Sequence, residues 1–224
     1  MKAGALAALA AALLILAPAC RTGDRGLPRL AAYDFEDGSA VGWAPDDPSH
    51  WRVVSEDGSK IYELTAPGAP GPVRAPASRS VLVGRDVSSF EFSGRLRCHT
   101  DPSNPFRDMC VIFHYQDPTH FCYVHFAGKS DDVHNIIGLV DGVDRVKINA
   151  EPAGASVFRL TDLAWHVFKV TCDSRTGEVR AYLDDMTVPI LTARATVPGH
   201  GRIGVGSFDD TGAFDDLELR VPGK

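Results

Sequence analysis

The chain has 224 residues, of which 44% are hydrophobic and 23% charged, and its formal net charge is -6 at pH 7. This length accommodates one sizeable domain, and all-β domains of this size are commonly a single unit. The negative charge argues against a nucleic-acid partner, because a surface that binds nucleic acid carries a clustered basic face.

The first residues have the pattern of an export signal. Lys2 is followed by an apolar run, Ala3–Ala17, that is too short to span a bilayer comfortably, and then by Pro18-Ala19-Cys20. A cysteine at this point resembles a bacterial lipoprotein signal, in which the Cys20 thiol is lipidated. We therefore expect a signal peptide over residues 1–19, a polar tether over residues 20–30, and a lipid anchor that holds the chain to the membrane of the bacterial cell envelope. The alternative is an ordinary secretory signal with a chance cysteine.

From residue 31 onward, short alternating runs separated by turn signals predict strands and no helix of useful length. The clearest hairpins join Trp51–Val54 to Lys60–Leu64, and Trp165–Cys172 to Glu178–Asp184. The segment Ala66–Arg79 carries four prolines and is predicted to be an exposed loop, because proline cannot donate to a strand ladder. Further strands are expected within 31–38 and at Ser80–Val83, Phe90–His99, Pro189–Arg194, Gly201–Ser207 and Phe214–Val221. The pattern indicates one all-β domain over residues 31–224, a two-sheet antiparallel sandwich.

Four cysteines lie inside this domain, at Cys98, Cys110, Cys122 and Cys172. An exported protein can oxidise them. Cys98 and Cys110 flank the polar loop His99–Met109 and could close its base, so this pair is the favoured disulfide. The alternative is that all four are buried free thiols.

Residues 108–149 hold most of the aromatic, histidine and basic residues that could face a ligand. Strands are predicted there at Cys110–Tyr115, Phe121–Phe126, Asn135–Val140 and Val143–Asn149. Alternation divides the first two strands into two faces. The smaller, more aliphatic set is assigned to the core: Cys110, Ile112, His114, Cys122, Val124 and Phe126. The other set is assigned to an exposed concave surface: Val111, Phe113, Tyr115, Phe121, Tyr123 and His125. The alternative is that this second set fills the core and His114 is exposed.

On that concave surface, Tyr115, Tyr123 and His125 would offer rings and polar tips to a sugar. Hydrogen-bond donors beside them are expected from Arg145 and Lys147. Lys129, His134 and Asn135 are expected to form a binding-rim loop. A zinc site built from the histidines of this stretch is not expected, because His114 and His125 have opposite parity on paired strands.

Several segments resemble the concanavalin A-like, or laminin-G-like, jelly roll: 34–38, the hairpin 165–185, 201–208 and 214–217. More narrowly, Tyr123-Val124-His125 followed by Gly128-Lys129 resembles bacterial proteins of the 3-keto-disaccharide hydrolase-like, or family-16-hydrolase-like, group. The resemblance implies a jelly-roll fold. It leaves the activity open, because the group includes both glycoside-active enzymes and non-catalytic sugar-binding modules.

Acidic residues at the two ends of the domain suggest a structural calcium ion. The first and last strands of jelly rolls commonly lie side by side, so oxygen ligands from both could converge. The candidates are Asp34, Glu36, Asp37, Asp215 and Asp216. The alternative is that these carboxylates serve turns and loop amides.

A retaining glycosidase of the laminarinase type needs two carboxylates about 5 Å apart. The predicted strands Cys110–Tyr115 and Phe121–Phe126 contain none. We therefore expect an envelope-anchored carbohydrate-binding domain without chemistry of its own. One alternative is a glycoside hydrolase or lyase that uses His125 as base and Tyr123 as acid or orienter. Another is a structural envelope protein with no small ligand.

Overall fold

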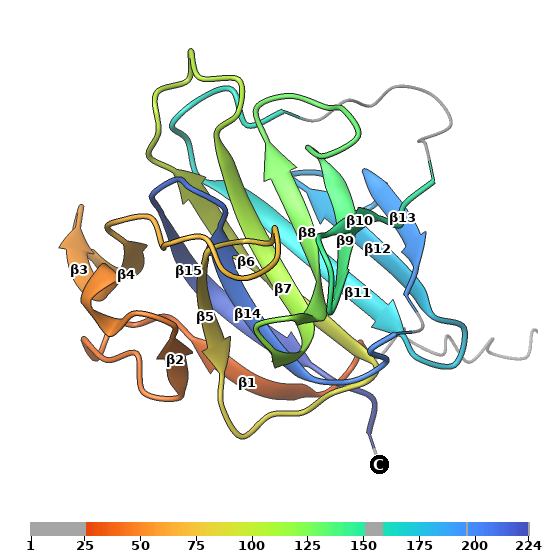
Figure 1. Ribbon diagram of the computed structural model, residues 1–224. Coiled ribbons are helices and arrows are strands. Elements are labelled where there is room, and N and C mark those ends of the chain that lie inside the picture. Colours follow the sequence, from red (N-terminus) through yellow and green to blue (C-terminus); the bar gives the residue numbers. More distant parts are fainter. Residues whose placement is uncertain (1–25, 151–158, 196, 224) are drawn as a thin grey trace, which may run out of the picture.

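The computed structural model describes residues 26–150, 159–195 and 197–223. The predicted signal peptide, Cys20 and the first part of the tether lie outside these residues. The described chain forms two antiparallel sheets packed face to face (Figure 1), which confirms the predicted all-β sandwich. The described part of the chain contains one short 3-10 turn, η1 (Pro48–His50), and no helix long and apolar enough to cross a membrane.

Sheet A is the larger sheet. Its order is β13 (Leu191–Arg194), β12 (Glu178–Leu183), β11 (His166–Asp173), β6 (Phe90–Cys98), β15 (Gly212–Arg220), β4 (Ser59–Leu64) and β3 (Trp51–Glu56), with β1 (Arg29–Tyr33) also paired to β15. Both predicted hairpins lie in it as β3–β4 and β11–β12. The pairing of β1 with β15 confirms that the first and last strands are neighbours.

Sheet B contains the strands of residues 108–149, the stretch that was predicted to face a ligand. Its order is β10 (Val146–Lys147), β9 (Ile136–Asp141), β8 (His120–Ala127), β7 (Asp108–Asp117), β14 (Arg202–Ser207), β5 (Ser78–Leu82) and β2 (Trp43–Pro45). The fourth predicted strand of that stretch is much shorter than expected, because only Val146 and Lys147 pair with β9.

The main core lies between the two sheets, and a second apolar cluster lies on the outer face of sheet B. Ala75 and Val73, from the proline-rich segment, and Phe208 cover this outer face. The proline-rich segment is therefore not a fully exposed loop as predicted. It closes the surface that was expected to be open.

The predicted faces of β7 are wrong for residues 110–113. In the observed register Cys110 stands opposite His125 and Ile112 opposite Tyr123, and directly paired residues point to the same side of a sheet. Cys110 and Ile112 therefore share the outer face with Tyr123 and His125. Val111 and Phe113 belong to the main core instead.

The predicted disulfide between Cys98 and Cys110 is also wrong, and all four cysteines of the domain are buried free thiols. Cys98 ends β6 in sheet A and points into the main core. Cys110 lies in sheet B and points to its outer face. The two side chains therefore leave their sheets in directions that cannot meet.

Candidate functional site

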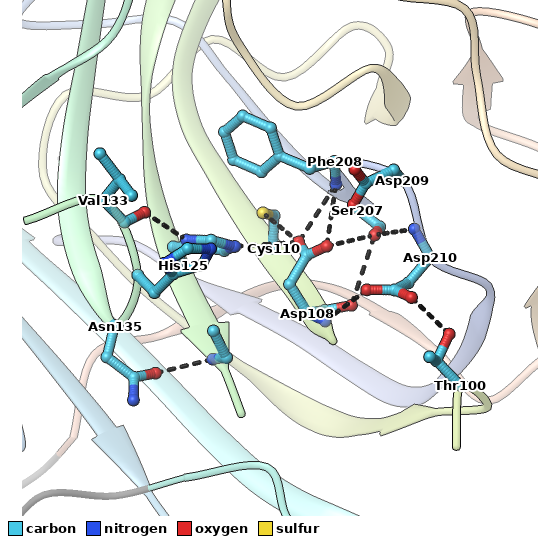
Figure 2. Close-up of polar contacts among 12 residues, drawn as sticks. Thr100, Asp108, Cys110, His125, Val133, Asn135, Ser207, Phe208, Asp209 and Asp210 are labelled. Atoms are coloured by element: carbon cyan, nitrogen blue, oxygen red, sulfur yellow. Dashed lines mark hydrogen bonds and ion pairs between the residues drawn. The ribbon is translucent and has the colours of Figure 1, made fainter. Parts of the chain in front are cut away.

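A buried polar cluster lies at one end of sheet B around Asp108, the first residue of β7 (Figure 2). Its Oδ1 accepts a hydrogen bond from Ser207 Oγ at 2.9 Å, and its Oδ2 accepts one from the backbone N–H of Phe208 at 3.1 Å. Cys110 Sγ donates to the same Oδ2 at 3.3 Å. Asp108 and Cys110 are fully buried, so these contacts replace the water that their side chains lose.

His125 joins this cluster from β8, directly opposite Cys110. Its Nδ1 lies 3.0 Å from the carbonyl oxygen of Val133, so Nδ1 carries a proton and donates it. Its Nε2 lies 3.2 Å from Asp108 Oδ2 but makes no hydrogen bond. The side chain is buried, and both ring nitrogens face protein groups rather than solvent.

Two carboxylates in this cluster have opposite pKa shifts. Burial alone would raise the pKa of Asp108, but the imidazole of His125 and the hydrogen bonds from Phe208 and Ser207 hold it below its ordinary value. Asp210 accepts hydrogen bonds from the backbone N–H of Asp108 at 2.7 Å and from the Thr100 hydroxyl. Burial, opposed by the Thr100 hydrogen bond and reinforced by the charge of Asp108, raises the pKa of Asp210 to about 6.

Three side chains lead from the buried cluster to solvent, and we call them the aromatic rim: Phe106, Lys129 and His134. The His134 and His125 rings have centroids 5.5 Å apart, and Phe106 lies 5.6 Å from His134. The ammonium of Lys129 lies 4.4 Å from the centre of the Phe106 ring. Phe106 is 53% exposed, and it is the one aromatic side chain among the exposed large hydrophobic residues of the described chain.

The loop between β8 and β9 holds two of these residues in place. Asp131 Oδ1 accepts hydrogen bonds from the backbone N–H of Val133 and of His134, each at 2.9 Å, and also lies 2.8 Å from His134 Nδ1. Its Oδ2 pairs with Lys129 Nζ at 2.8 Å. Asn135 adopts a positive φ of 51°, and its Oδ1 accepts from the backbone N–H of Ala127 at 2.7 Å, which closes the loop.

On the other side of His125, two arginine side chains pack against the ring of Phe208. The centroid of the Phe208 ring lies 4.9 Å from that of His125. The guanidinium of Arg145 lies 4.7 Å and that of Arg74 5.1 Å from the centre of the Phe208 ring. Arg74 also lies 3.9 Å from Asp209, and both of these side chains are substantially exposed. Charged groups thus stand on both sides of the buried histidine.

The predicted ligand residues divide into two groups. Tyr115, Tyr123 and His125 do lie on the outer face of sheet B, but the expectation that they are exposed is wrong, because Ala75 and Phe208 pack over that face. Lys129, His134 and Asn135 lie on the loop between β8 and β9, and their role in binding stays a prediction. Arg145 lies over Phe208, and Lys147 is 4.0 Å from Asp132 at the edge of the sheet.

Tyr123 is the clearest case of burial. It has no solvent exposure, and its ring occupies the space that a side chain at Gly138 would need, since a Cβ there would stand 2.4 Å from the ring. Among the described residues its hydroxyl has no hydrogen-bond partner. Burial raises the pKa of this hydroxyl well above its ordinary value.

The remaining histidines of the stretch do not converge on a common point. His114 is buried, with its Nε2 2.9 Å from the carbonyl oxygen of Ser88. His120 pairs with Asp117 in the β7–β8 turn at 2.9 Å.

The five residues proposed for calcium are not brought together. Glu36 accepts hydrogen bonds from Ser59 Oγ and Lys60 N, and both Asp215 and Asp216 pair with Arg95. Asp34 and Asp37 each accept a backbone N–H two residues ahead, which is turn chemistry. Clusters of donor atoms in the described chain instead involve Asp108, either with Cys110 and His125 or with Asp209 and Asp210.

Sequence reasoning missed the residues at the centre of the cluster. The predicted first strand begins at Cys110, so its alternation does not include Asp108 and does not relate the Asp108 carboxylate to His125. Ser207 and Asp210 follow β14, which lies beside β7 only through a long-range pairing. Phe106 could have been found, because a phenylalanine in the polar loop His99–Met109 is a candidate for exposure.

No protein-family model and no curated protein matches this sequence. Solved structures do match its fold. A carbohydrate-binding module, CBM66, from Bacillus subtilis has a TM-score of 0.55 at 14% identity, over 80% of this chain and 96% of that one. A Bacteroides ovatus GH16 in complex with the product G4G4G3G has a TM-score of 0.53 at 12% identity, over 87% of each chain. Lectin I-B4 from Griffonia simplicifolia, in a metal-free form, has a TM-score of 0.53 at 11% identity, over 84% of this chain and 98% of that one. The fold is a concanavalin A-like jelly roll.

Proposed function

We propose that this chain is a carbohydrate-binding jelly-roll domain that binds sugar at the aromatic rim, without chemistry of its own. The observation that carries the proposal is the exposed ring of Phe106 between Lys129 and His134. A sugar ring needs an aromatic face for its C–H groups and nearby donors for its hydroxyls. Jelly-roll structures of similar fold include a carbohydrate-binding module, a lectin and a glycosidase, which supports this class of ligand.

The position of the rim also supports this proposal over binding on the sheet face. The outer face of sheet B is filled by its own aromatic side chains and covered by the proline-rich segment. A ligand at the rim meets side chains that already reach solvent, whereas a ligand on the sheet face would first have to displace packed residues.

The geometry favours binding over the alternative of a glycoside-active enzyme. A general base must reach the proton that it abstracts. Both nitrogens of His125 face protein groups, and the side chain is buried. The Tyr123 hydroxyl is buried as well. Neither candidate catalytic group faces the rim in this arrangement.

The test is a panel of soluble polysaccharides in affinity electrophoresis, with reducing-end and keto-sugar assays on the same samples. Phe106→Ala should weaken retention by the best polysaccharide about tenfold, which corresponds to about 1.4 kcal/mol. Val188→Ala is the control, because Val188 is 57% exposed in the segment between β12 and β13. Unchanged retention of Phe106→Ala, or no retention of the wild type by any polysaccharide, would contradict the proposal. Sugar release by the wild type would favour the enzyme.

We also propose that the domain is anchored to the bacterial cell envelope through Cys20, on the basis of the N-terminal sequence. In a bacterial host, Cys20→Ser should move the protein from the membrane fraction to the soluble fraction. An unchanged distribution would contradict the lipid anchor.

A further inference from the structure

Three metal-ligating side chains converge in the buried cluster: Asp108, Cys110 and His125 (Figure 2). Each offers one donor atom, and these atoms all lie within 4.8 Å of one another. The strand pairing produces this convergence. Asp108 and Cys110 alternate onto the same face of β7, and His125 stands opposite Cys110 on β8. Rigid neighbouring strands therefore hold all three donors.

The hydrogen bonding of His125 uses Nδ1 and leaves Nε2 with only the ion-pair contact to Asp108. Nδ1 must keep its proton to donate to the Val133 carbonyl. The His125 Nε2 lies 3.2 Å from Asp108 Oδ2 without a hydrogen bond, within ion-pair distance. A metal ion here would take the place of the Nε2 proton and would be bound by both atoms.

We propose that Asp108 Oδ2, Cys110 Sγ and His125 Nε2 form a binding site for a zinc-type divalent metal ion. Bonds of about 2.0 Å to nitrogen and oxygen and about 2.3 Å to sulfur, at tetrahedral angles, place N and O about 3.3 Å apart and S and O about 3.5 Å apart. The corresponding separations here are 3.2 Å and 3.3 Å. Two of the three donor separations are therefore close to those of tetrahedral zinc ligands, and the third, between Cys110 Sγ and His125 Nε2, is at most 4.8 Å.

The donor types and their surroundings select the metal. Sulfur and imidazole nitrogen suit zinc, whereas calcium takes oxygen ligands. The other contacts are those of a supported site: Nδ1 of the histidine donates to a backbone carbonyl, and Oδ1 of Asp108 accepts from Ser207. The alternative trio, Asp108 with Asp209 and Asp210, is weaker, because both oxygens of Asp210 already accept hydrogen bonds.

Cobalt titration tests the proposal directly, and its readout is independent of sugar binding. The whole chain is unfolded with chelator, refolded, and titrated with Co²⁺ alone. We expect one Co²⁺ per chain with the thiolate-to-cobalt charge-transfer absorption of a cysteine ligand, and displacement of the Co²⁺ by Zn²⁺. Cys110→Ser, close in size and so the variant least expected to disturb folding, should lose that absorption. Cys172→Ser is the control, because Cys172 is also a buried thiol but lies in sheet A, and this variant should retain the absorption.

Asp209→Asn distinguishes the proposed site from the alternative trio of Asp108, Asp209 and Asp210. The proposal predicts that it binds Co²⁺ with the same absorption as the wild type. No Co²⁺ uptake by the folded wild type, or an absorption unchanged in Cys110→Ser, would overturn the proposal. Uptake lost in Asp209→Asn but kept without thiolate absorption in the wild type would assign the metal to the acidic trio instead.

Discussion

Replacing Tyr123 with phenylalanine should stabilise the domain. The Tyr123 side chain has no solvent exposure, and its hydroxyl has no hydrogen-bond partner among the described residues. A buried polar group without a partner costs about 1–3 kcal/mol relative to water. Phenylalanine removes this cost and keeps the ring, so we expect Tyr123→Phe to raise the free energy of unfolding by about 1–2 kcal/mol. For a domain of this size, that is a rise in melting temperature of about 2–8 °C.

Tyr62 provides a control with the opposite sign. It is almost as deeply buried, but its hydroxyl bonds to Ser80 Oγ at 2.8 Å. Tyr62→Phe loses that bond and leaves Ser80 without its partner, so it should lower the free energy of unfolding by about 1 kcal/mol. Urea denaturation of the two variants beside the wild type measures both effects. A destabilised Tyr123→Phe would refute the reasoning, because it would mean that the hydroxyl has a partner in solution.

The remaining predictions concern charge, packing and thiols. Asp210 has a pKa of about 6 in the folded chain against 3.8 unfolded, so its stability penalty is fully present above pH 6 and disappears as the pH falls toward 4. Relative to the wild type, Asp210→Asn should therefore gain about 1–3 kcal/mol of stability between pH 4 and pH 8 in chelator, in the same urea titrations; a stability difference that is the same at both pH values would contradict the shift. Gly138→Ala should destabilise the domain by about 1–3 kcal/mol because its Cβ collides with the Tyr123 ring, and a wild-type denaturation midpoint would show that the ring can move aside. Ellman's reagent should find the domain's four cysteines unreactive when folded and free when unfolded without reductant, and a missing pair of thiols would reveal a disulfide.

Much of the fold could be predicted because its hairpins are local. In the β11–β12 hairpin, Phe168, Val170 and Cys172 pair with Leu183, Ala181 and Val179, as their alternation predicted. A short turn fixes the register of such a pair, and a buried face then fixes the direction of every side chain. The pairing of β1 with β15 followed from fold resemblance rather than from any local signal.

The faces of β7 could not be predicted in the same way, because the alternation of this strand is broken. His114 has a positive φ of 51°, and the pairing with β8 shifts between Phe113 and Asp117. This bulge returns Tyr115 to the outer face, beside Phe121, although Phe113 lies in the main core. A parity count from Tyr115 backward therefore assigns residues 110–113 to the wrong side, although His114 does contact the core residues Phe90 and Phe113.

The same bulge bears on the proposed sugar site. By turning Tyr115 outward, it extends the aromatic layer that the proline-rich segment covers, and so the face of sheet B is closed. The proposed sugar site is therefore at the rim, where the Phe106 ring contacts His134 and the His134 ring contacts His125. The sugar and metal proposals are therefore separable: Phe106→Ala changes a surface that lies outside the metal cluster. Cys110→Ser changes the cluster beneath an intact rim. If Cys110→Ser weakened sugar retention as much as Phe106→Ala, the metal would have to hold His125, and through it His134, in the position that binds sugar.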